Sequence, residues 1–161
     1  MEPMYRQRKA FMSLVSDLCK ELSYPERDEE LRDDETLVME MTLEGVAFNV
    51  SHSLNEHPEK ILIQAAFGPL PDARRADVLY RIMHLNRELS EAGLATLAYD
   101  AATGSVVYIH AAVLAELSGA ILLSTMTEIT WRAEYWQSTY FLQDDGQSSP
   151  EKFNEQFISL A

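Results

Sequence analysis

The four histidines are the side chains best suited to acid–base or metal chemistry in this sequence, and their spacing supports neither. His52 and His57 are five positions apart and Pro58 follows them, whereas a zinc-binding helix places its two histidines four positions apart. His84 falls on a predicted helix and His110 on a predicted strand, where packing or hydrogen bonding is the expected role. We therefore predict no metal site and no histidine base.

A second concentration of titratable groups is the acidic segment at residues 26–35. It holds seven acids against Arg27 and Arg32, a net charge of −5. A charge run of this kind is typical of a solvated loop, where carboxyl pKa values stay ordinary. The segment also lacks the glycine turn and the alternating spacing of a calcium-binding loop. We expect a loop here rather than a metal or acid–base site.

The motifs of nucleophilic and nucleotide-dependent enzymes are missing as well. The sequence contains no G-x-G-x-x-G, no P-loop and no G-x-S-x-G elbow. Cys19 is the only cysteine, so no intrachain disulfide can form. It shares an apolar helical stripe with Phe11, Val15 and Leu22, which predicts a small buried hydrophobe rather than a reactive thiol. We expect no enzymatic activity and no cofactor.

Length and charge indicate a single globular domain with protein partners. The chain has 161 residues, 47% of them hydrophobic, and a net charge of −13. That charge has the wrong sign for binding nucleic acid phosphates or an anionic membrane surface, and it favours basic partners. The N-terminus does not resemble a secretory signal, and the longest apolar stretch, residues 109–123, is too short and polar to span a bilayer. We expect a cytoplasmic location.

The elements that would position these residues follow from hydrophobic periodicity. Helical spacing predicts helices over residues 4–22, from about 72 to Gly93, and over 112–141, and alternation predicts strands over 36–43, 46–51, 60–67, 94–99 and 106–111. The order is α-β-β-β-α-β-β-α, an α+β fold with an antiparallel sheet packed by helices. We expect one domain at residues 4–141, followed by a polar linker and tail at 142–161.

Residues 79–111 carry a resemblance to a known family. The carriers are Leu79-Tyr-Arg-Ile-Met-His-Leu-Asn86, Gly93, Leu97-Ala-Tyr-Asp100, Thr103-Gly104, Val106-Val-Tyr-Ile109 and the late Trp136. With the order of elements, they make residues 4–136 resemble the class I type III secretion chaperones of the CesT, or Tir chaperone, family. The resemblance implies a homodimer that binds the N-terminal region of a secreted effector in extended form, keeps it soluble and uses no nucleotide. The aromatic tail departs from the family pattern, and three roles stay open for it: covering the groove, joining the dimer, or disorder.

Apolar residues left over after the predicted core is filled suggest two binding surfaces. Effector-binding candidates are Val38, Ala47, Leu62 and Ala66 on one sheet face, with Phe11 and Val15 on the first helix. Burial of that face under the chain's own helix or tail remains an equal alternative. Met39 and Met41 are either ordinary core or adaptable binding surface. We expect Leu62→Asp to weaken effector binding and leave the dimer intact.

The second surface is expected where both faces of the late hairpin are apolar. Dimer-interface candidates are Leu79, Ile82, Leu97, Tyr99, Val107 and Ile109, because a second copy is an economical cover for such a face. Two other functions stay open. One is a dimeric binding or regulatory module outside secretion, and the other is a small-molecule enzyme with a pocket among Tyr99, Tyr108, His84 and His110.

Overall fold

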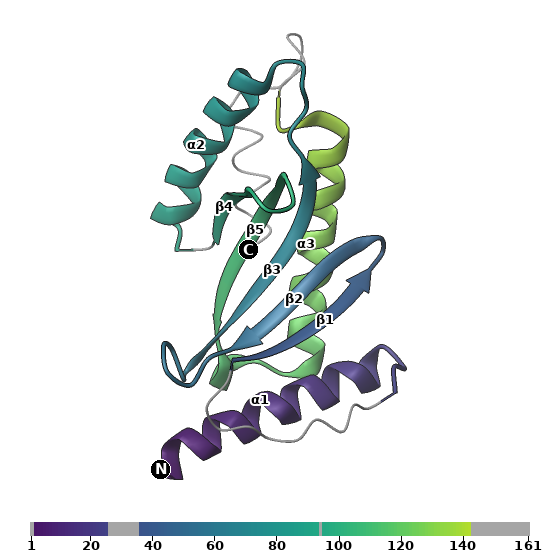
Figure 1. Ribbon diagram of the computed structural model, residues 1–161. Helices are drawn as coiled ribbons and strands as arrows, with labels where there is room; N and C mark the ends of the chain where they lie inside the picture. The colour runs from purple at the N-terminus through teal and green to yellow at the C-terminus, as the bar shows by residue number, and fades with distance from the viewer. Residues whose placement is uncertain (1, 26–35, 94, 143–161) are drawn as a thin grey trace. The chain divides into compact units, whose positions relative to one another are not determined.

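The computed structural model of the chain describes residues 2–25, 36–93 and 95–142 (Figure 1). In chain order the elements are α1 (Glu2–Glu21), β1 (Leu37–Leu43), β2 (Val46–His52), β3 (Lys60–Pro69), α2 (Arg75–Glu91), β4 (Ala95–Asp100), β5 (Ser105–Val113), the short 3₁₀ turn η1 (Leu114–Glu116) and α3 (Gly119–Thr139). The strands form one sheet in the order β1-β2-β3-β5-β4. The α+β order expected from the sequence is confirmed.

The chain divides into two compact units, which we describe separately. The first unit contains Met1–Gln64 and Ala111–Thr127, and the second contains Ala65–His110 and Glu128–Ala161. The predicted acidic loop at 26–35 and the predicted tail after Leu142 lie outside the described residues. No helix in the described part of the chain is long and apolar enough to cross a membrane.

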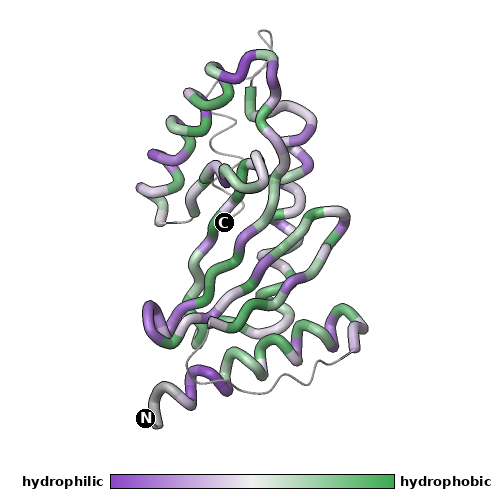
Figure 2. Tube along the Cα trace, viewed as in Figure 1, coloured by the Kyte–Doolittle hydropathy of each residue, from purple (hydrophilic) through white to green (hydrophobic). Residues whose placement is uncertain are grey.

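The β1–β2 hairpin of the first unit places its hydrophobic residues on one face. The two strands are antiparallel, with Met39 opposite Val50 and Met41 opposite Phe48. Gly45 has a φ of 83° in the two-residue turn, a conformation that glycine adopts without steric cost. Alternation then gives β2 the burial pattern expected of a strand with one face in the core. Its tube carries both hydrophobic and hydrophilic colours (Figure 2).

Helix α1 packs through one apolar stripe. Phe11, Leu14 and Leu18 are each at most 4% exposed, and their spacing of three and four residues puts them on one helical face. The start of α3 approaches this helix closely. A Cβ atom added to Gly119 would lie 2.7 Å from the carbonyl carbon of Asp17. Glycine therefore allows the two helices to meet here.

The last helix begins later than the sequence predicted. We expected it from about residue 112, but β5 continues to Val113, η1 follows, and α3 starts at Gly119. The backbone N–H of Leu114 donates to the carbonyl of Glu59 at 2.9 Å, which ties the end of β5 into the first unit. The Ser118 hydroxyl then accepts a bond from the Ile121 N–H at 3.2 Å and caps the helix.

The second unit is built on the β4–β5 hairpin and α2. Asp100 holds the hairpin turn, accepting bonds from the Thr103 hydroxyl at 2.8 Å and the Ala102 N–H at 2.9 Å. These bonds, the Thr103 one foremost, lower the pKa of the Asp100 carboxyl. Gly104 closes the turn with a φ of 69°. The hairpin formed by the predicted strands at residues 94–99 and 106–111 is present.

Helix α2 buries one stripe of its surface, which is made of Val78, Ile82, Leu85 and Leu89. Leu79 and Met83 lie outside this stripe and point outward, with exposures of 39% and 73%. The helix starts at Arg75 rather than near residue 72, because Arg74 adopts a left-handed conformation with a φ of 57°.

Candidate functional site: an apolar groove beside an edge strand

A groove of about 350 Å³ lies in the first unit between α1 and β1, elements that run beside each other in Figure 1. Its lining comes from α1, the turn that follows it and β1: Phe11, Met12, Val15, Leu18, Cys19, Leu22, Tyr24, Pro25, Leu37, Val38, Met39, Glu40, Met41 and Thr42. Most of these side chains are apolar. The groove therefore suits hydrophobic side chains of a partner rather than a polar substrate.

The strand that forms one wall has an unpaired edge. β1 is the end member of the sheet order and pairs with β2 alone among the described strands. An edge strand presents a row of backbone N–H and C=O groups that another extended chain can pair with. Apolar pockets next to such an edge are the arrangement used in strand addition of a peptide.

Sulfur-containing side chains make up much of the groove wall. Met12 and Met41 are half-buried, and Met39 is 9% exposed. Cys19 is also only partly buried and lines the same groove, so the prediction that it is a buried hydrophobe is only partly met. Methionine side chains are flexible and polarizable, and they adapt to partner side chains of different shape.

A buried polar cluster packs against Phe11, one of the residues that line the groove. His52 is fully buried, its Nε2–H donates to the Pro58 carbonyl at 2.9 Å, and its ring stacks on Phe11 with centroids 5.2 Å apart. Nη1 of Arg8 donates to the His52 carbonyl at 3.3 Å. Burial lowers the pKa of His52, the Pro58 bond opposes this shift, and the charge of Arg8 adds to it. The neutral imidazole thus acts as packing that fixes Phe11.

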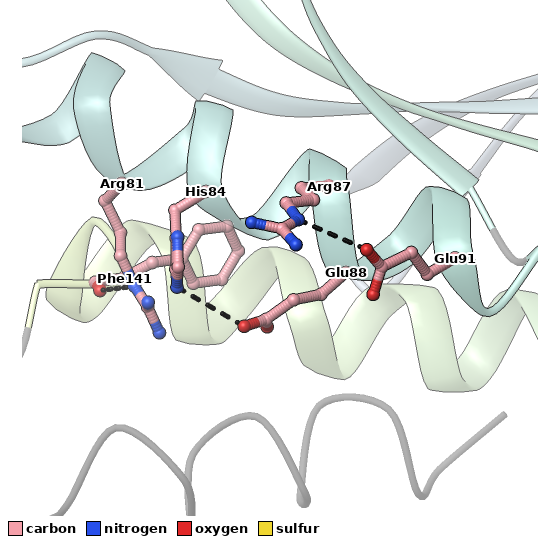
Figure 3. A network of polar contacts seen from close by, with 6 residues as sticks. All are labelled: Arg81, His84, Arg87, Glu88, Glu91 and Phe141. Carbon is pink, nitrogen blue, oxygen red and sulfur yellow. Dashed lines mark hydrogen bonds and ion pairs between the residues drawn. The ribbon is translucent and has the colours of Figure 1, made fainter.

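A separate apolar surface lies on α2 in the second unit. Leu79, Tyr80 and Met83 are exposed, Tyr80 by 77%, and Tyr99 of β4 is 47% exposed with Arg75 over its ring. The flank of this surface is polar (Figure 3): His84 lies 3.4 Å from Glu88, and Arg87 lies 3.2 Å from Glu91. An exposed apolar strip with a polar rim is typical of a protein–protein contact.

Comparison with protein families decides what kind of protein carries these surfaces. The model of the Tir chaperone protein (CesT) family matches residues 29–137, which is more than half of the chain. The chain belongs to the CesT family. This match spans β1 to the last turns of α3 and includes the helix-hairpin that carried the resemblance in the sequence.

Three solved complexes are similar in fold to this CesT family member. The crystal structure of the ExsC–ExsE complex has a TM-score of 0.60 at 16% identity, covering 81% of this chain and 92% of that chain. The Yersinia pestis type III secretion chaperone SycH, solved with a stable fragment of YscM2, has a TM-score of 0.59 at 17% identity, with coverages of 78% and 98%. The HopA1–SchA chaperone–effector complex gives 0.59 at 16% identity, with coverages of 82% and 96%. No curated protein matches the chain.

In this CesT family member the six effector-binding candidates fall into different places. Phe11, Val15 and Val38 all line the groove. Ala47 is exposed and Leu62 half-buried at strand positions that alternate with the core residues, so they share the outward sheet face with Val38 but do not line the groove. Ala66 is exposed and belongs to the second unit. The groove residues Met12, Leu22 and Tyr24 were not identified from the sequence.

The dimer-interface candidates of the CesT family member also divide. Leu79 and Tyr99 are exposed, Val107 and Ile109 are half-buried, and Ile82 and Leu97 are buried inside the second unit, at 8% and 3% exposure. Tyr80 and Met83 join the outward surface. Both could have been found from the sequence, because Tyr80 is next to Leu79 and Met83 is one helical turn after it.

The residues of the suggested enzyme pocket do not share one environment. Tyr108 is buried, stacks on Phe67, and accepts a bond at 3.2 Å from Nη1 of Arg132. Burial raises the pKa of this phenol. Tyr99 and His84 instead lie on the exposed side of their elements. No group of three or more His, Cys, Asp or Glu side chains in the described part of the chain is arranged to hold a metal ion.

Proposed function

We propose that this protein is a cytoplasmic type III secretion chaperone that acts as a homodimer. It binds the N-terminal region of a secreted effector as an extended segment, keeps it soluble and secretion-competent, and performs this role by binding alone, without nucleotide or covalent chemistry. The observation that carries the proposal is the apolar groove beside the free edge of β1, in a chain of the CesT family.

The groove supports this function through two kinds of contact. The backbone of an added strand pairs with the edge of β1, and alternate side chains of that strand enter the space between α1 and β1. Burying one valine- or leucine-sized side chain contributes about 2 kcal/mol. Two or three such side chains therefore offset the cost of ordering the segment and hold it away from aggregation.

Co-purification from the native host tests the function. We expect the chaperone to retain one large protein through its N-terminal region. Cys19 then locates the contact, because it is the only cysteine and lines the groove. Bound effector should slow alkylation of Cys19 by N-ethylmaleimide, and unchanged alkylation in the complex would place the effector elsewhere.

A matched pair of variants distinguishes the groove from the outward sheet face beyond it. Val15→Asp puts a charge into the groove, and Leu62→Asp puts the same charge on the sheet outside the groove; both native side chains are half-buried. Val15→Asp should weaken effector binding about tenfold or more. A larger loss of affinity with Leu62→Asp would assign the effector to the outward sheet face. Wild-type affinity in both variants would argue against either site.

The homodimer is proposed to form through the apolar surface of α2. Met83→Asp places a charge on that surface, and Ile121→Asp makes the same change at an exposed apolar position of α3, 50% exposed, in the first unit. Sedimentation equilibrium should show a dimer for the wild type and for Ile121→Asp, and a monomer for Met83→Asp. A wild-type monomer at micromolar concentration would refute the dimer.

A further inference from the structure

Glu40 is an unusual member of the groove wall. Of the described residues that line the groove, it alone carries a charge. It sits in the middle of β1, on the strand with the unpaired edge, and its side chain is exposed. A carboxylate at this place contacts whatever segment pairs with that edge.

The neighbours of Glu40 that the structure describes on β1 and β2 carry no charge. Asn49 lies directly opposite on β2, and Val38 and Thr42 are its neighbours on the same face of β1. All three are uncharged. Within residues 2–25, 36–93 and 95–142, Glu40 forms no ion pair and no side-chain hydrogen bond.

Strand geometry fixes what an added segment places beside this carboxylate. Residues directly opposite on paired strands bring their Cβ atoms to about 5 Å of each other. Because side chains alternate between faces, the residues before and after that position point to the face of Met39 and Met41. One residue of the bound effector segment, here called the client, thus lies beside Glu40. Its two sequence neighbours enter the apolar part of the groove lined by Met39 and Met41.

We infer that the client segment alternates aliphatic residues with polar ones and carries a lysine or arginine at the polar position beside Glu40. This inference rests on the proposed function and names the class of sequence that the groove selects. The net charge of −13 attracts basic segments in general. Glu40 converts that general attraction into a preference at one position of the strand.

A different role for Glu40 is protection of the edge. Charged side chains on edge strands discourage pairing between copies of the same protein. In that role Glu40 lowers self-association without selecting the charge of a client. The two roles give different results in the same experiment.

Three peptides test the preference. Their common sequence is Ser-Leu-Thr-Leu-X-Leu-Thr-Leu-Ser, acetylated, amidated and labelled at one end, with Lys, Gln or Glu at X. Binding to the full-length protein is measured by fluorescence anisotropy at low and moderate salt. We expect Lys to bind about threefold more tightly than Gln and about tenfold more tightly than Glu, the size of cross-strand charge pairing.

Variants of Glu40 provide the decisive comparison. Glu40→Gln should remove most of the preference, and Glu40→Lys should reverse it in favour of the Glu peptide. Glu44→Gln is the matched control, because Glu44 is an exposed acid in the same hairpin and does not line the groove. It should keep the wild-type order of affinities.

Each other result overturns a defined part of the reasoning. Tight binding that ignores the charge at X refutes the preference and leaves the proposed function standing. Increased self-association of Glu40→Gln with unchanged selectivity assigns Glu40 to edge protection. An equal loss of selectivity in Glu44→Gln attributes the effect to the overall charge, and no binding of any peptide refutes the groove as a strand site and the inference with it.

Discussion

Asn86 offers a sharp test of how α2 holds the hairpin of the second unit. Its side-chain NH₂ donates to the Leu97 carbonyl at 2.8 Å, and its side-chain oxygen accepts from the Leu97 N–H at 2.7 Å. β4 is the end member of the sheet order, so one amide side chain satisfies both backbone groups of a residue at the strand's outer edge. Asn86→Ala removes both bonds and leaves the helix intact.

The magnitude follows from those two bonds. A hydrogen bond of this kind contributes about 1 kcal/mol net, and the cost rises when the group left behind is shielded from water. Leu97 is 3% exposed, so its backbone groups are poorly placed to recover both bonds from solvent. We expect Asn86→Ala to lower the free energy of unfolding by about 2 kcal/mol and the melting temperature by about 6 °C.

Urea unfolding at one fixed protein concentration measures this effect. The midpoint should fall while the m-value stays constant, and the Leu97 amide should exchange its hydrogen faster than in the wild type. Asn86→Asp is the matched variant, because its carboxylate still accepts from the Leu97 N–H but cannot donate to the carbonyl. A loss below about 0.5 kcal/mol for Asn86→Ala, with unchanged exchange at Leu97, would refute the argument.

Three further predictions concern stability. Gly119→Ala should destabilise the protein by about 1–3 kcal/mol in urea unfolding, although alanine favours helices, because the added Cβ would meet the α1 backbone; a stabilised variant would contradict the close approach. Because burial lowers the pKa of His52 below 6.5, the folded state binds its proton less tightly than the unfolded state. Stability should therefore be full above about pH 7 and fall as the pH drops below 6.5 toward the folded pKa, and His52→Gln should flatten this slope in urea midpoints measured between about pH 5 and 8. A chain that ends at Leu142 should keep a cooperative melting transition by circular dichroism. One that ends at Thr139 loses Phe141, which is 1% exposed and accepts a hydrogen bond from Arg81, and should melt about 10 °C lower. Equal melting temperatures of the two chains would show that Phe141 does not anchor the end of α3.

The order of elements was predictable because most segments have one clear period. β2 and β3 alternate along their whole length, and the Glu44–Gly45 pair marks the turn before β2. The start of α3 was misplaced because residues 112–117 are apolar except for Glu116 and show no period that separates a strand end from a helix. The available signal was Ser118, a residue that commonly caps helices and does so here.

The groove was harder to predict because it joins segments that are distant in the sequence. Met12 and Met41 line one space, yet their elements are separated in the sequence by the acidic segment at residues 26–35. Periodicity identifies which face of each element is apolar, but it does not say which two faces meet. Helix α2 shows the same limit, since Val78 and Leu79 begin two adjacent apolar stripes and only tertiary packing selects Val78 for the core.

Client binding and self-association should be separable in this protein, because the two proposed surfaces share no residue. The groove belongs entirely to the first unit and the α2 surface entirely to the second. Effects of substitutions at sites without common contacts usually add. The double variant Val15→Asp, Met83→Asp should therefore show the sum of the two single effects in free energy of client binding, measured by titration at protein concentrations on either side of the dimer dissociation constant. The contrary result has two parts: Met83→Asp alone lowers the affinity for the client, and adding Val15→Asp lowers it no further. It would mean that the client bridges both protomers and binds only to the dimer.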